Sequence, residues 1–399
     1  MIVKRVVVVG GSLAGLRAAQ AVRDHGHDGV LTIIGAEPHR PYSRPPLSKG
    51  LLTSGMEFDQ LALEGRDYAL DAEWRLGCQA TRLDLVRRRV GLDTGEEVSF
   101  DGVIIATGAQ PRRPEESWAI QGVETLRSID DARRIRDAIA ASCRVLIVGA
   151  GFLGTEVASA CRTLGVEVTV IEAAHYVLAP LGAQAGQVCA EIMCAAGVDL
   201  RLNTTLTGVS SYAGKLEAAR LADGSRVSAD LIVFAVGTKP AVDWLSSSGV
   251  SCRGGIRCDA AGLVLGTTGV VAAGDVARWD HFLTPEAPRT EHWSTAAEQG
   301  AWAGRRLLDA DVGPLRHVPS FWSDQFGIRI QVAGFPGVAE SSLVASGSLK
   351  SQRFIQLFTR RRRLVGAVAF DMPRALARAR RLIDDQAMLT QPALAWGLD

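Results

Sequence analysis

Two glycine-rich stretches have the residue types and spacing needed to bind the phosphates of dinucleotides. Residues 5–15 read RVVVVGGSLAG, and residues 144–154 read RVLIVGAGFLG. In both, an apolar strand leads through a glycine turn into a helix, where unpaired N–H groups and the helix dipole point at one anion. An acidic residue, Glu37 or Glu172, follows the next apolar run and could accept hydrogen bonds from a ribose. The pattern predicts two βαβ dinucleotide sites.

The first stretch departs from the usual pattern at its third position, where Ser12 replaces glycine. Serine is small, and its hydroxyl could itself bond a phosphate. Taken alone, this stretch is also compatible with an ordinary glycine turn in an α/β domain. The second stretch has all three glycines, Gly149, Gly151 and Gly154. Two such folds in one chain predict two different dinucleotides.

The elements that must position these loops are repeated as well. Residues 76–108 and 200–237 each alternate short strands with turns and end in an apolar strand. Gly165 is expected to cap the helix that follows the second loop. Residues 262–276 are expected to form one further strand that ends at Asp275.

The character of the chain changes past Pro314. Residues 319–370 read as strands, and an Ala/Arg-rich helix is expected over residues 373–384. This part predicts a third domain, of the α+β class. We therefore expect an α/β protein with two Rossmann-like dinucleotide-binding domains and a C-terminal α+β domain.

Composition and length fit a globular protein of two or three domains. The 399 residues are 47% hydrophobic and 22% charged, with a net charge of +1. No stretch approaches the roughly 20 apolar residues of a membrane span. The first strand is expected to begin at residue 2 or 3, so no signal peptide is expected. We expect a cytoplasmic protein that binds neither membranes nor nucleic acid.

The cysteines are expected to be structural thiols. None of the seven lies in a Cys-x-x-Cys motif, and their spacing indicates no zinc site, so no metal is expected. Cys143 and Cys161 lie beside or within apolar elements, where a thiol behaves as a small hydrophobe. Cys189 and Cys194 are five residues apart in a predicted helix and share no face well. The remaining cysteines are Cys78, Cys252 and Cys258.

Five short motifs carry a resemblance to a known family. They are the RPPLSK sequence at residues 44–49, the strand that ends in ATG at 106–108, Leu126–Arg127, AGD at 273–275, and WSDQ at 322–325. Together they make the chain resemble the flavin-dependent pyridine nucleotide reductases with paired nucleotide folds. Within these it is most similar to the NADH-dependent ferredoxin reductases of the putidaredoxin reductase type, which serve cytochromes P450 and aromatic-ring oxygenases. The resemblance covers essentially the whole chain.

The resemblance implies a glutathione-reductase-like arrangement of the domains. Residues 1–112 and 242–317 would form a discontinuous FAD-binding domain, residues 113–241 the NAD-binding domain, and residues 318–399 the C-terminal domain. An Asp at position 275 would bind the ribityl–phosphate region of FAD at another helix N-terminus. Read from the residues alone, Asp275 could be the N-cap of the following helix, and both roles can hold at once.

The residues that the resemblance places at the two cofactors can be named by position. For FAD they are Gly10, Ser12, Leu13, Ala14, Glu37, Arg44, Lys49, Ala80, Ala106, Thr107, Gly108, Arg127, Gly274, Asp275, Trp293 and Trp322. For NAD they are Gly149, Gly151, Phe152, Leu153, Gly154, Glu156, Glu172 and Gly237. Trp293 and Trp322 could also be ordinary packing residues.

NADH is favoured over NADPH at the second fold. The charge of Glu172 would repel a 2′-phosphate. The residues after it, AAHY at 173–176, provide no arginine to receive one.

The resemblance gives catalytic roles to Lys49 and Glu156. The matching lysine of the family lies against the flavin edge. The matching glutamate meets the nicotinamide amide and pairs with that lysine. From the residues alone, a lysine at a helix start is usually exposed, and a carboxylate near a helix N-terminus is favoured by the dipole.

The chain lacks the cysteine pair that flavin disulfide reductases carry where residues 43–49 read SRPPLSK. Thiol redox chemistry at the flavin is therefore disfavoured. The flavin would then pass its electrons outward to another acceptor. The resemblance implies that electrons pass from NADH through FAD to a ferredoxin that supplies a cytochrome P450 or ring-hydroxylating oxygenase, and a flavin can link the two-electron and one-electron steps. The alternatives are an NADH oxidase, a rubredoxin-type reductase, and an NADH-switched flavoprotein of the apoptosis-inducing-factor kind.

Ferredoxins are commonly acidic, so a basic docking surface is expected. Residues 350–385 contain ten Lys or Arg against three Asp, and the run Arg360–Arg363 is expected at a hairpin tip. A solvated turn and a nucleic-acid contact are the alternative interpretations of this run. The protein is expected to be a monomer or a weak homodimer.

Overall fold

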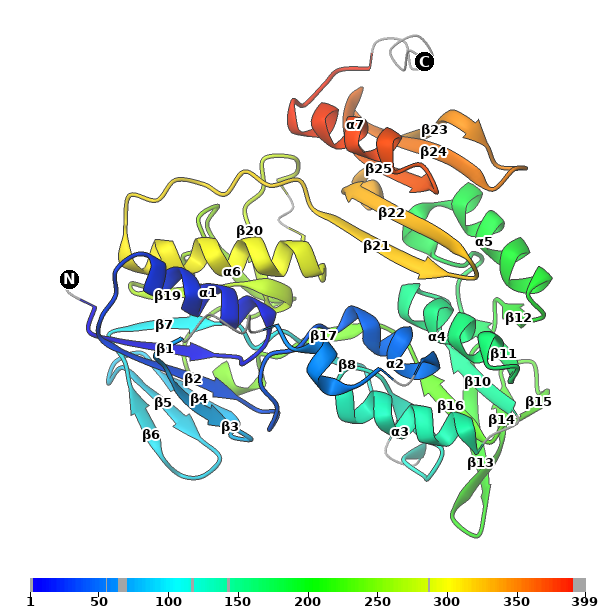
Figure 1. Ribbon diagram of the computed structural model, residues 1–399, viewed down its shortest axis with the longest axis horizontal. Coiled ribbons are helices and arrows are strands. Elements are labelled where there is room, and N and C mark those ends of the chain that lie inside the picture. The colour runs from blue at the N-terminus through cyan, green and yellow to red at the C-terminus, as the bar shows by residue number, and fades with distance from the viewer. Residues whose placement is uncertain are drawn as a thin grey trace. The chain divides into compact units, whose positions relative to one another are not determined.

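The computed structural model of the protein describes residues 3–54, 56–63, 70–115, 118–141, 144–285 and 288–389. The chain forms two compact units (Figure 1). Unit 1 comprises residues 1–43, 58–110 and 239–319, and unit 2 comprises residues 44–57, 111–238 and 320–399. Each unit is described by itself. The three-domain division expected from the sequence stays a prediction.

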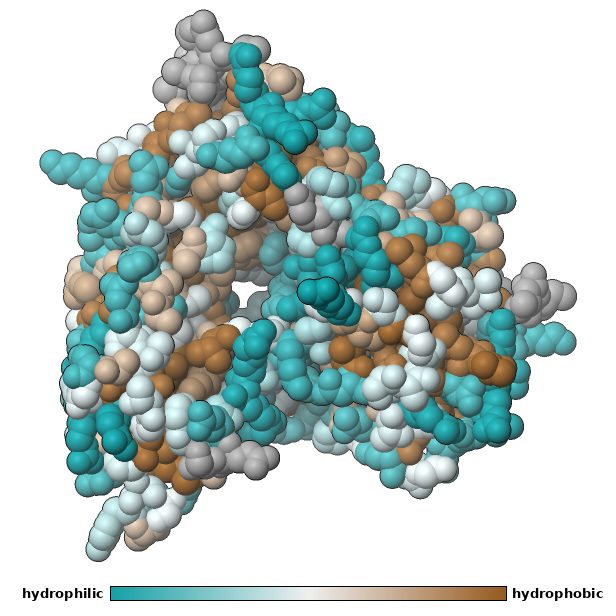
Figure 2. Space-filling view, turned by 180° about the vertical axis from the view of Figure 1, so that it is seen from behind, coloured by the Kyte–Doolittle hydropathy of each residue, from teal (hydrophilic) through white to brown (hydrophobic). Residues whose placement is uncertain are grey.

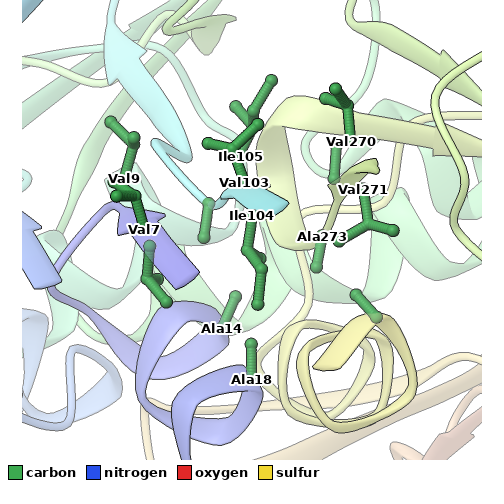
Figure 3. Close-up of a cluster of buried hydrophobic side chains, with 14 of the residues drawn as sticks. Val7, Val9, Ala14, Ala18, Val103, Ile104, Ile105, Val270, Val271 and Ala273 are labelled. Carbon is green, nitrogen blue, oxygen red and sulfur yellow. The ribbon is translucent and has the colours of Figure 1, made fainter. Parts of the chain in front are cut away.

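A five-stranded parallel sheet forms the centre of unit 1. Its strands run in the order β19 (Val270–Ala272), β7 (Gly102–Ile105), β1 (Arg5–Val9), β2 (Val30–Gly35) and β3 (Glu73–Leu76). The run Val6–Val9 is fully buried, as its continuous apolar sequence predicted for a strand covered on both faces. Figure 3 shows the apolar side chains of β1, β7 and β19 gathered in this core.

Helices α1 (Leu13–Asp24) and α6 (Trp293–Leu308) lie side by side against this sheet (Figures 1 and 3). Glycines on α6 allow their close approach. A Cβ atom at Gly300 would lie 2.3 Å from the Ala14 carbonyl oxygen, and one at Gly304 would lie 2.4 Å from that of Ala18. The backbone of α6 therefore packs directly against the first turns of α1.

The rest of unit 1 is made of short strands. An antiparallel meander consists of β4 (Ala80–Asp84), β5 (Arg89–Leu92) and β6 (Glu97–Ser99). A further pair is β18 (Ile256–Cys258) with β20 (Ala277–Trp279). Strands β8 (Ala109–Pro111) and β17 (Thr238–Pro240) also pair, and the division between the two units falls within each of these strands. Single 3₁₀ turns occur at Phe58–Leu61, Asp243–Leu245 and Gly274–Val276.

Unit 2 contains a second parallel sheet of the same design. Its strands run in the order β12 (Asp199–Leu202), β11 (Glu167–Glu172), β10 (Arg144–Val148), β16 (Leu231–Phe234) and β9 (Val123–Thr125). The helices are α3 (Ile129–Ala140), α4 (Phe152–Thr163) and α5 (Ala183–Ala195), and the meander is β13 (Leu206–Tyr212), β14 (Lys215–Leu221) and β15 (Arg226–Ser228). Gly165 ends α4 with a φ of +76°, as predicted. Both sequence repeats are thus repeats of structure.

The repeat extends to the side chains that fix each central strand. The Arg5 N–H and guanidinium donate to the Asp101 carboxylate, at 2.9 and 2.8 Å. The Arg144 N–H and guanidinium donate to Asp230 in the same way, at 3.0 and 2.7 Å. Bonding to Arg5 lowers the pKa of Asp101 to about 2. The arginine at the start of each glycine-rich stretch therefore bonds to a carboxylate that directly precedes the neighbouring strand, β7 or β16.

The C-terminal part of unit 2 is an antiparallel sheet with one helix. Its strands run in the order β21 (Ser320–Gln325), β22 (Ile328–Gly334), β25 (Arg363–Phe370), β24 (Arg353–Arg360) and β23 (Ser341–Ser348), with α7 at Pro373–Asp384. The predicted helix and the strands corresponding to β22, β24 and β25 are confirmed. Strands β21 and β23 complete the sheet. The hairpin tip predicted at the arginine run is confirmed, because Arg361 and Arg362 form the turn between β24 and β25.

Segment 44–57 belongs to unit 2 by its contacts. It forms a 3₁₀ helix at Pro45–Ser48 and a short helix α2 at Gly50–Thr53, which pack against α3 and α4. Further 3₁₀ turns in the described part of unit 2 include Ala179–Leu181 and Pro336–Val338.

Two sequence-based expectations about residues 262–276 are wrong. Only Val270–Ala272 is a strand, because the chain turns at Gly266 and Gly269 and Leu263 pairs back antiparallel to Val271. Asp275 does not cap a helix. It lies inside a three-residue 3₁₀ turn that leads into β20, and the next helix, α6, begins at Trp293.

The surface of the molecule is mixed in character. On the face drawn in Figure 2, hydrophilic and hydrophobic residues are interspersed, as is usual for folded proteins. No helix among the described residues is long and apolar enough to cross a membrane. In the same part of the chain, no cluster of three or more His, Cys, Asp or Glu side chains is placed to hold a metal ion.

The packing of α6 on α1 generates a test. We expect Gly300→Ala to lower the free energy of unfolding by about 1–2 kcal/mol, because the overpacking outweighs the helix propensity gained by alanine. Urea unfolding measures the change. Gly313→Ala is the matched control in unit 1, since a Cβ there meets nothing within 4 Å. Equal stability of both variants would contradict the close contact.

Candidate functional site

The helices that follow the two glycine-rich loops have uncapped N-termini. Ser12 is the N-cap residue of α1, yet its side chain makes no capping hydrogen bond, and α4 has Gly151 at this position. Neither helix has an acidic residue in its first turn. In contrast, Ser128 and Asp131 form a complete capping box on α3. The N–H groups at the starts of α1 and α4 are therefore left for an external anion.

The glycine turns before α1 and α4 are built alike. Gly10 has a φ of +124°, and a Cβ there would lie 2.1 Å from the Ala106 carbonyl oxygen. Gly149 has a φ of +105°, and a Cβ there would lie 2.5 Å from the Ala235 carbonyl oxygen. Only glycine fits at either position, because both the backbone angle and the contact exclude a side chain.

The third position of the pattern is less constrained by the fold. A Cβ at Gly151 would meet nothing within 4 Å, and its φ of −75° is open to any residue. Ser12 occupies the equivalent position with a φ of −123°. Serine at position 12 is therefore compatible with the same backbone path. Glycine at position 151 is not required by its backbone angles, and its lack of a side chain leaves open space beside the loop.

The two acidic residues expected at the riboses are not structurally equivalent. The Gly10 N–H donates to the Ile34 carbonyl, and the Gly149 N–H donates to the Ile171 carbonyl, both at 2.8 Å. This aligns Glu172 with Gly35, so Glu37 lies two residues further along. The different spacing shows that the two loops are similar copies with differently placed carboxylates.

Glu172 is held by the backbone around it. Its carboxylate accepts hydrogen bonds from the Ala150 N–H at 2.7 Å and from the Ala174 N–H at 2.8 Å. In unit 1, Glu37 accepts a hydrogen bond from the Tyr42 hydroxyl. Both carboxylates are therefore fixed near the end of the second strand of their fold, where acceptors for ribose hydroxyls are expected.

Three further segments of unit 1 carry residues expected at FAD. A Cβ at Gly274 would lie 2.9 Å from the Cβ of Ala14, so the 273–275 turn touches that helix. The Thr107 hydroxyl donates to the Ala241 carbonyl at 2.8 Å, which fixes the chain after β7. Trp293 begins α6, and its indole N–H is buried with no hydrogen-bond partner in the described structure. This donor is available to a ligand.

The remaining residues expected at the cofactors lie as follows. Ala80 and Leu13 are buried, Arg44 donates to the Arg127 carbonyl at 2.6 Å, and Trp322 is 39% exposed. Gly108 and Gly237 follow β7 and β16 with φ values of +70° and +88°. Burial lowers the pKa of His292, beside Trp293, to about 4, although the charge of Asp275 opposes the shift.

Lys49 and Glu156 form a partly buried ion pair in unit 2. The Lys49 Nζ atom is 2.7 Å from Glu156 Oε2, and the two side chains are 22% and 8% exposed. Lys49 follows the 3₁₀ helix of segment 44–57, and Glu156 lies in the second turn of α4, directly after the second glycine loop. The structure therefore joins the two residues for which the resemblance implied catalytic roles.

Two serines that we did not single out also hold Glu156. The Ser48 hydroxyl donates to Oε2 at 2.5 Å, and the Ser323 hydroxyl donates to Oε1 at 2.6 Å. Gln325 in turn donates to the Ser323 oxygen at 3.0 Å. Both serines lie inside motifs that carried the resemblance, RPPLSK and WSDQ, which is the one signal in the sequence that pointed to them.

Asp324 adds a second carboxylate near Lys49. The Arg329 guanidinium donates to it at 2.6 and 3.0 Å and is the main cause that holds the pKa of Asp324 below its usual value. The charge of Lys49 contributes in the same direction. Acidic and basic groups thus alternate from Glu156 through Lys49 and Asp324 to Arg329.

The described cysteines offer no sulfur relay. Burial raises the pKa values of Cys161 and Cys189 to about 12 and also raises those of Cys252 and Cys258, so these thiols stay protonated. Cys194 is exposed on the other side of α5 from Cys189, as predicted, and the six described cysteines are all free. Cys143 lies outside the described residues.

Comparison with known families and structures agrees with this arrangement. Residues 4–300 match the family described as pyridine nucleotide-disulphide oxidoreductase, and residues 320–396 match the one described as reductase C-terminal. The chain belongs to the pyridine nucleotide-disulphide oxidoreductase family. Membership of this family implies the use of a pyridine nucleotide and a flavin.

Individual members of the family resemble the chain along its whole length. It is 33% identical, over 98% of its length and 95% of the relative's, to the benzene 1,2-dioxygenase system ferredoxin–NAD(+) reductase subunit of Pseudomonas putida. The ferredoxin reductase for the CYP199A2 system from Rhodopseudomonas palustris matches with a TM-score of 0.93 at 26% identity, covering 99% of this chain and 98% of that one. Putidaredoxin reductase, solved in a covalent complex with putidaredoxin, matches with a TM-score of 0.91 at 27% identity, covering 96% and 93%.

The open space at Gly151 generates a test. We expect Gly151→Ala to leave the free energy of unfolding within about 0.5 kcal/mol of wild type or slightly above it. Binding of NAD⁺ should weaken roughly tenfold, because the added methyl occupies space that a pyrophosphate would enter. Urea unfolding and calorimetry measure the two effects. Gly149→Ala, in contrast, should lose stability. Wild-type affinity in Gly151→Ala would show that no phosphate approaches this loop.

Proposed function

We propose that the protein is an FAD-dependent ferredoxin–NAD(+) reductase. The observation that carries the proposal is the partly buried Lys49–Glu156 pair one turn beyond an uncapped dinucleotide loop, with no sulfur relay among the cysteines that the structure describes. FAD, when bound, would accept a hydride and release electrons one at a time to an iron–sulfur protein. Relatives of the same family that match almost the whole chain carry this activity in their names.

The residues of unit 1 fit an adenine dinucleotide. The uncapped N-terminus of α1 offers N–H groups to phosphates, Glu37 offers acceptors to a ribose, and the unpartnered Trp293 N–H is a buried donor. We assign FAD to this fold, within a domain formed by residues 1–112 and 242–317. The nicotinamide dinucleotide is assigned to the fold of residues 113–241.

The second fold is proposed to prefer NADH. Glu172 accepts hydrogen bonds from two backbone N–H groups, so its charge is fixed at the end of β11. A 2′-phosphate at this position would face that charge without a compensating arginine from residues 173–176. Free ribose hydroxyls would instead find an acceptor there.

Lys49 and Glu156 are proposed to orient the nicotinamide end of the substrate rather than to exchange protons with it. Hydride transfer itself needs no acid or base from the protein. It needs the reacting carbon held in place and water kept away. A buried carboxylate that is bound by Lys49 and two serine hydroxyls provides such a fixed acceptor.

A basic surface of the C-terminal region is proposed to dock ferredoxin. Arg361 and Arg362 are exposed at the β24–β25 turn. Along α7, Arg374, Arg378 and Arg381 are exposed at helical spacing. An acidic partner would be attracted to these charges, and the attraction would weaken as salt is added.

One experiment tests the activity and the docking surface together. The purified protein should be yellow, lose its colour with NADH without air, and regain it on addition of a ferredoxin encoded beside it. Raising the salt from about 0.05 to about 0.5 M should slow ferredoxin reduction several-fold but barely change ferricyanide reduction. Arg361→Gln with Arg362→Gln should reduce this salt effect, whereas Arg226→Gln, an exposed arginine of the meander, should not.

The same measurement distinguishes the alternatives. A colourless protein that cannot take up FAD would overturn the proposal. Fast reoxidation by air alone would favour an oxidase. A long-lived reduced complex that changes the oligomeric state would favour a switch protein. Equal salt dependence with both acceptors would remove the basic surface as the docking site.

The role of Lys49 can be tested by substitution. We expect Lys49→Ala to keep its FAD but to be reduced by NADH roughly tenfold more slowly or worse, because Glu156 loses its counter-charge. Stopped-flow absorbance of the flavin measures the rate. Lys215→Ala, an exposed lysine on β14, is the matched control. Reduction of Lys49→Ala at the wild-type rate would reject the role.

A further inference from the structure

The first strand of the C-terminal sheet runs along the helix that follows the nicotinamide loop. The Phe321 ring of β21 meets the Phe152 ring of α4 edge-on, with centroids 4.8 Å apart. At the other end, the Phe326 N–H donates to the Ser159 hydroxyl at 2.7 Å. The α4 residues 152, 156 and 159 share one face of the helix. Strand β21 is therefore fixed against this face at both ends.

Ser323 lies between these two contacts and reaches Glu156. Its side chain is completely buried, and Gln325, two residues along the same face of β21, is 4% exposed. A carboxylate can only accept, so the hydroxyl proton of Ser323 points at Glu156 Oε1. The amide of Gln325 donates to the Ser323 oxygen and so leaves the hydroxyl only this direction for its proton.

The hydrogen bonds leave Glu156 with one place for a ligand. A carboxylate has about four acceptor positions, two on each oxygen. Lys49 and Ser48 occupy Oε2, and Ser323 occupies one position on Oε1. The remaining acceptor position is therefore on the oxygen that Ser323 holds.

We infer that Ser323 is a positioning residue that acts through Glu156 on the binding of NADH. This inference rests on the proposed function. Ser323 would fix Oε1 so that its free position accepts a hydrogen bond from the nicotinamide carboxamide, and Gln325 would set the direction of the Ser323 hydroxyl. The C-terminal region would thereby take part in binding the nucleotide, and the WSDQ sequence would be required for this contact.

A double-mutant cycle tests the inference on the full-length holoenzyme. Calorimetry with NAD⁺ gives the dissociation constant without turnover, and stopped-flow absorbance gives the rate of flavin reduction by NADH. Ser323→Ala should weaken NAD⁺ binding and slow reduction, each by about tenfold. Ser323→Thr, which keeps a hydroxyl, should stay within about twofold of wild type. In a Glu156→Ala background, Ser323→Ala should have no further effect.

Two further variants complete the test. Ser346→Ala removes a half-buried serine from β23, at the opposite edge of the same sheet, and should behave as wild type. Gln325→Ala leaves Ser323 in place but removes its donor, and should give a smaller loss that also vanishes without Glu156. It serves for the cycle if Ser323→Ala does not fold.

The outcomes separate this inference from the proposed function. If wild-type protein is not reduced by NADH, the proposed function fails. If wild type is reduced and Ser323→Ala matches it, only the role of Ser323 fails. An equal loss from Ser323→Ala with and without Glu156 would also overturn it, because the serine would then act independently. A similar loss in Ser346→Ala would assign the effect to general destabilisation of the sheet.

Discussion

The direct contact between a glycine and the carbonyl of a neighbouring strand underlies both halves of the molecule. Gly10 lies against Ala106, and Gly149 lies against Ala235, at distances that no side chain allows. Each contact lets the chain leave the end of its central strand and enter a helix after only three residues. The start of that helix then stands at the carboxyl end of the strands, where parallel sheets bind their ligands. Close packing of backbone is thus the condition for anion binding.

The free N–H groups at the starts of α1 and α4 depend on this geometry and on the absence of capping side chains. Helix α3 satisfies its own first N–H groups with Ser128 and Asp131, which stabilises it without a ligand. Helices α1 and α4 omit both devices, although Ser12 has the hydroxyl to cap one of them. They rely on burial against their sheets for stability. Each helix is less stable without a cap, but its first N–H groups can instead form hydrogen bonds to a phosphate and so contribute to its binding.

Much of this architecture could be predicted from the sequence because it depends on local patterns. The buried valines of β1, the glycine turns, the cap at Gly165 and the arginine hairpin all follow from residues close together in the chain. Predictions failed where a short apolar run was divided by turns, as at Leu263 and Val271. The expectation that Asp275 caps a helix failed for a similar reason, since a strand follows it, whereas its expected contact with FAD stays a prediction.

The long-range part of the site could not be derived from local patterns. Ser323 and Glu156 are 167 residues apart, and no periodicity in either segment indicates that they meet. The unequal placement of Glu37 and Glu172 became visible only when the hydrogen bonds of the glycine turns aligned the two folds. Resemblance to a family joined Lys49 to Glu156, but the two serines and the glutamine around the pair required coordinates.

The turn at the tip of the β24–β25 hairpin has an unusual composition. Arg361 and Arg362 both adopt left-handed backbone angles, with φ values of 48° and 64°, where asparagine and glycine are the residues of choice. Each arginine there carries a conformational penalty of order 1 kcal/mol or more. The hairpin therefore has lower stability than an asparagine–glycine turn would give, and it presents two charges at its tip. Replacing both arginines by asparagine and glycine would stabilise this turn, and the same replacement would remove its two charges.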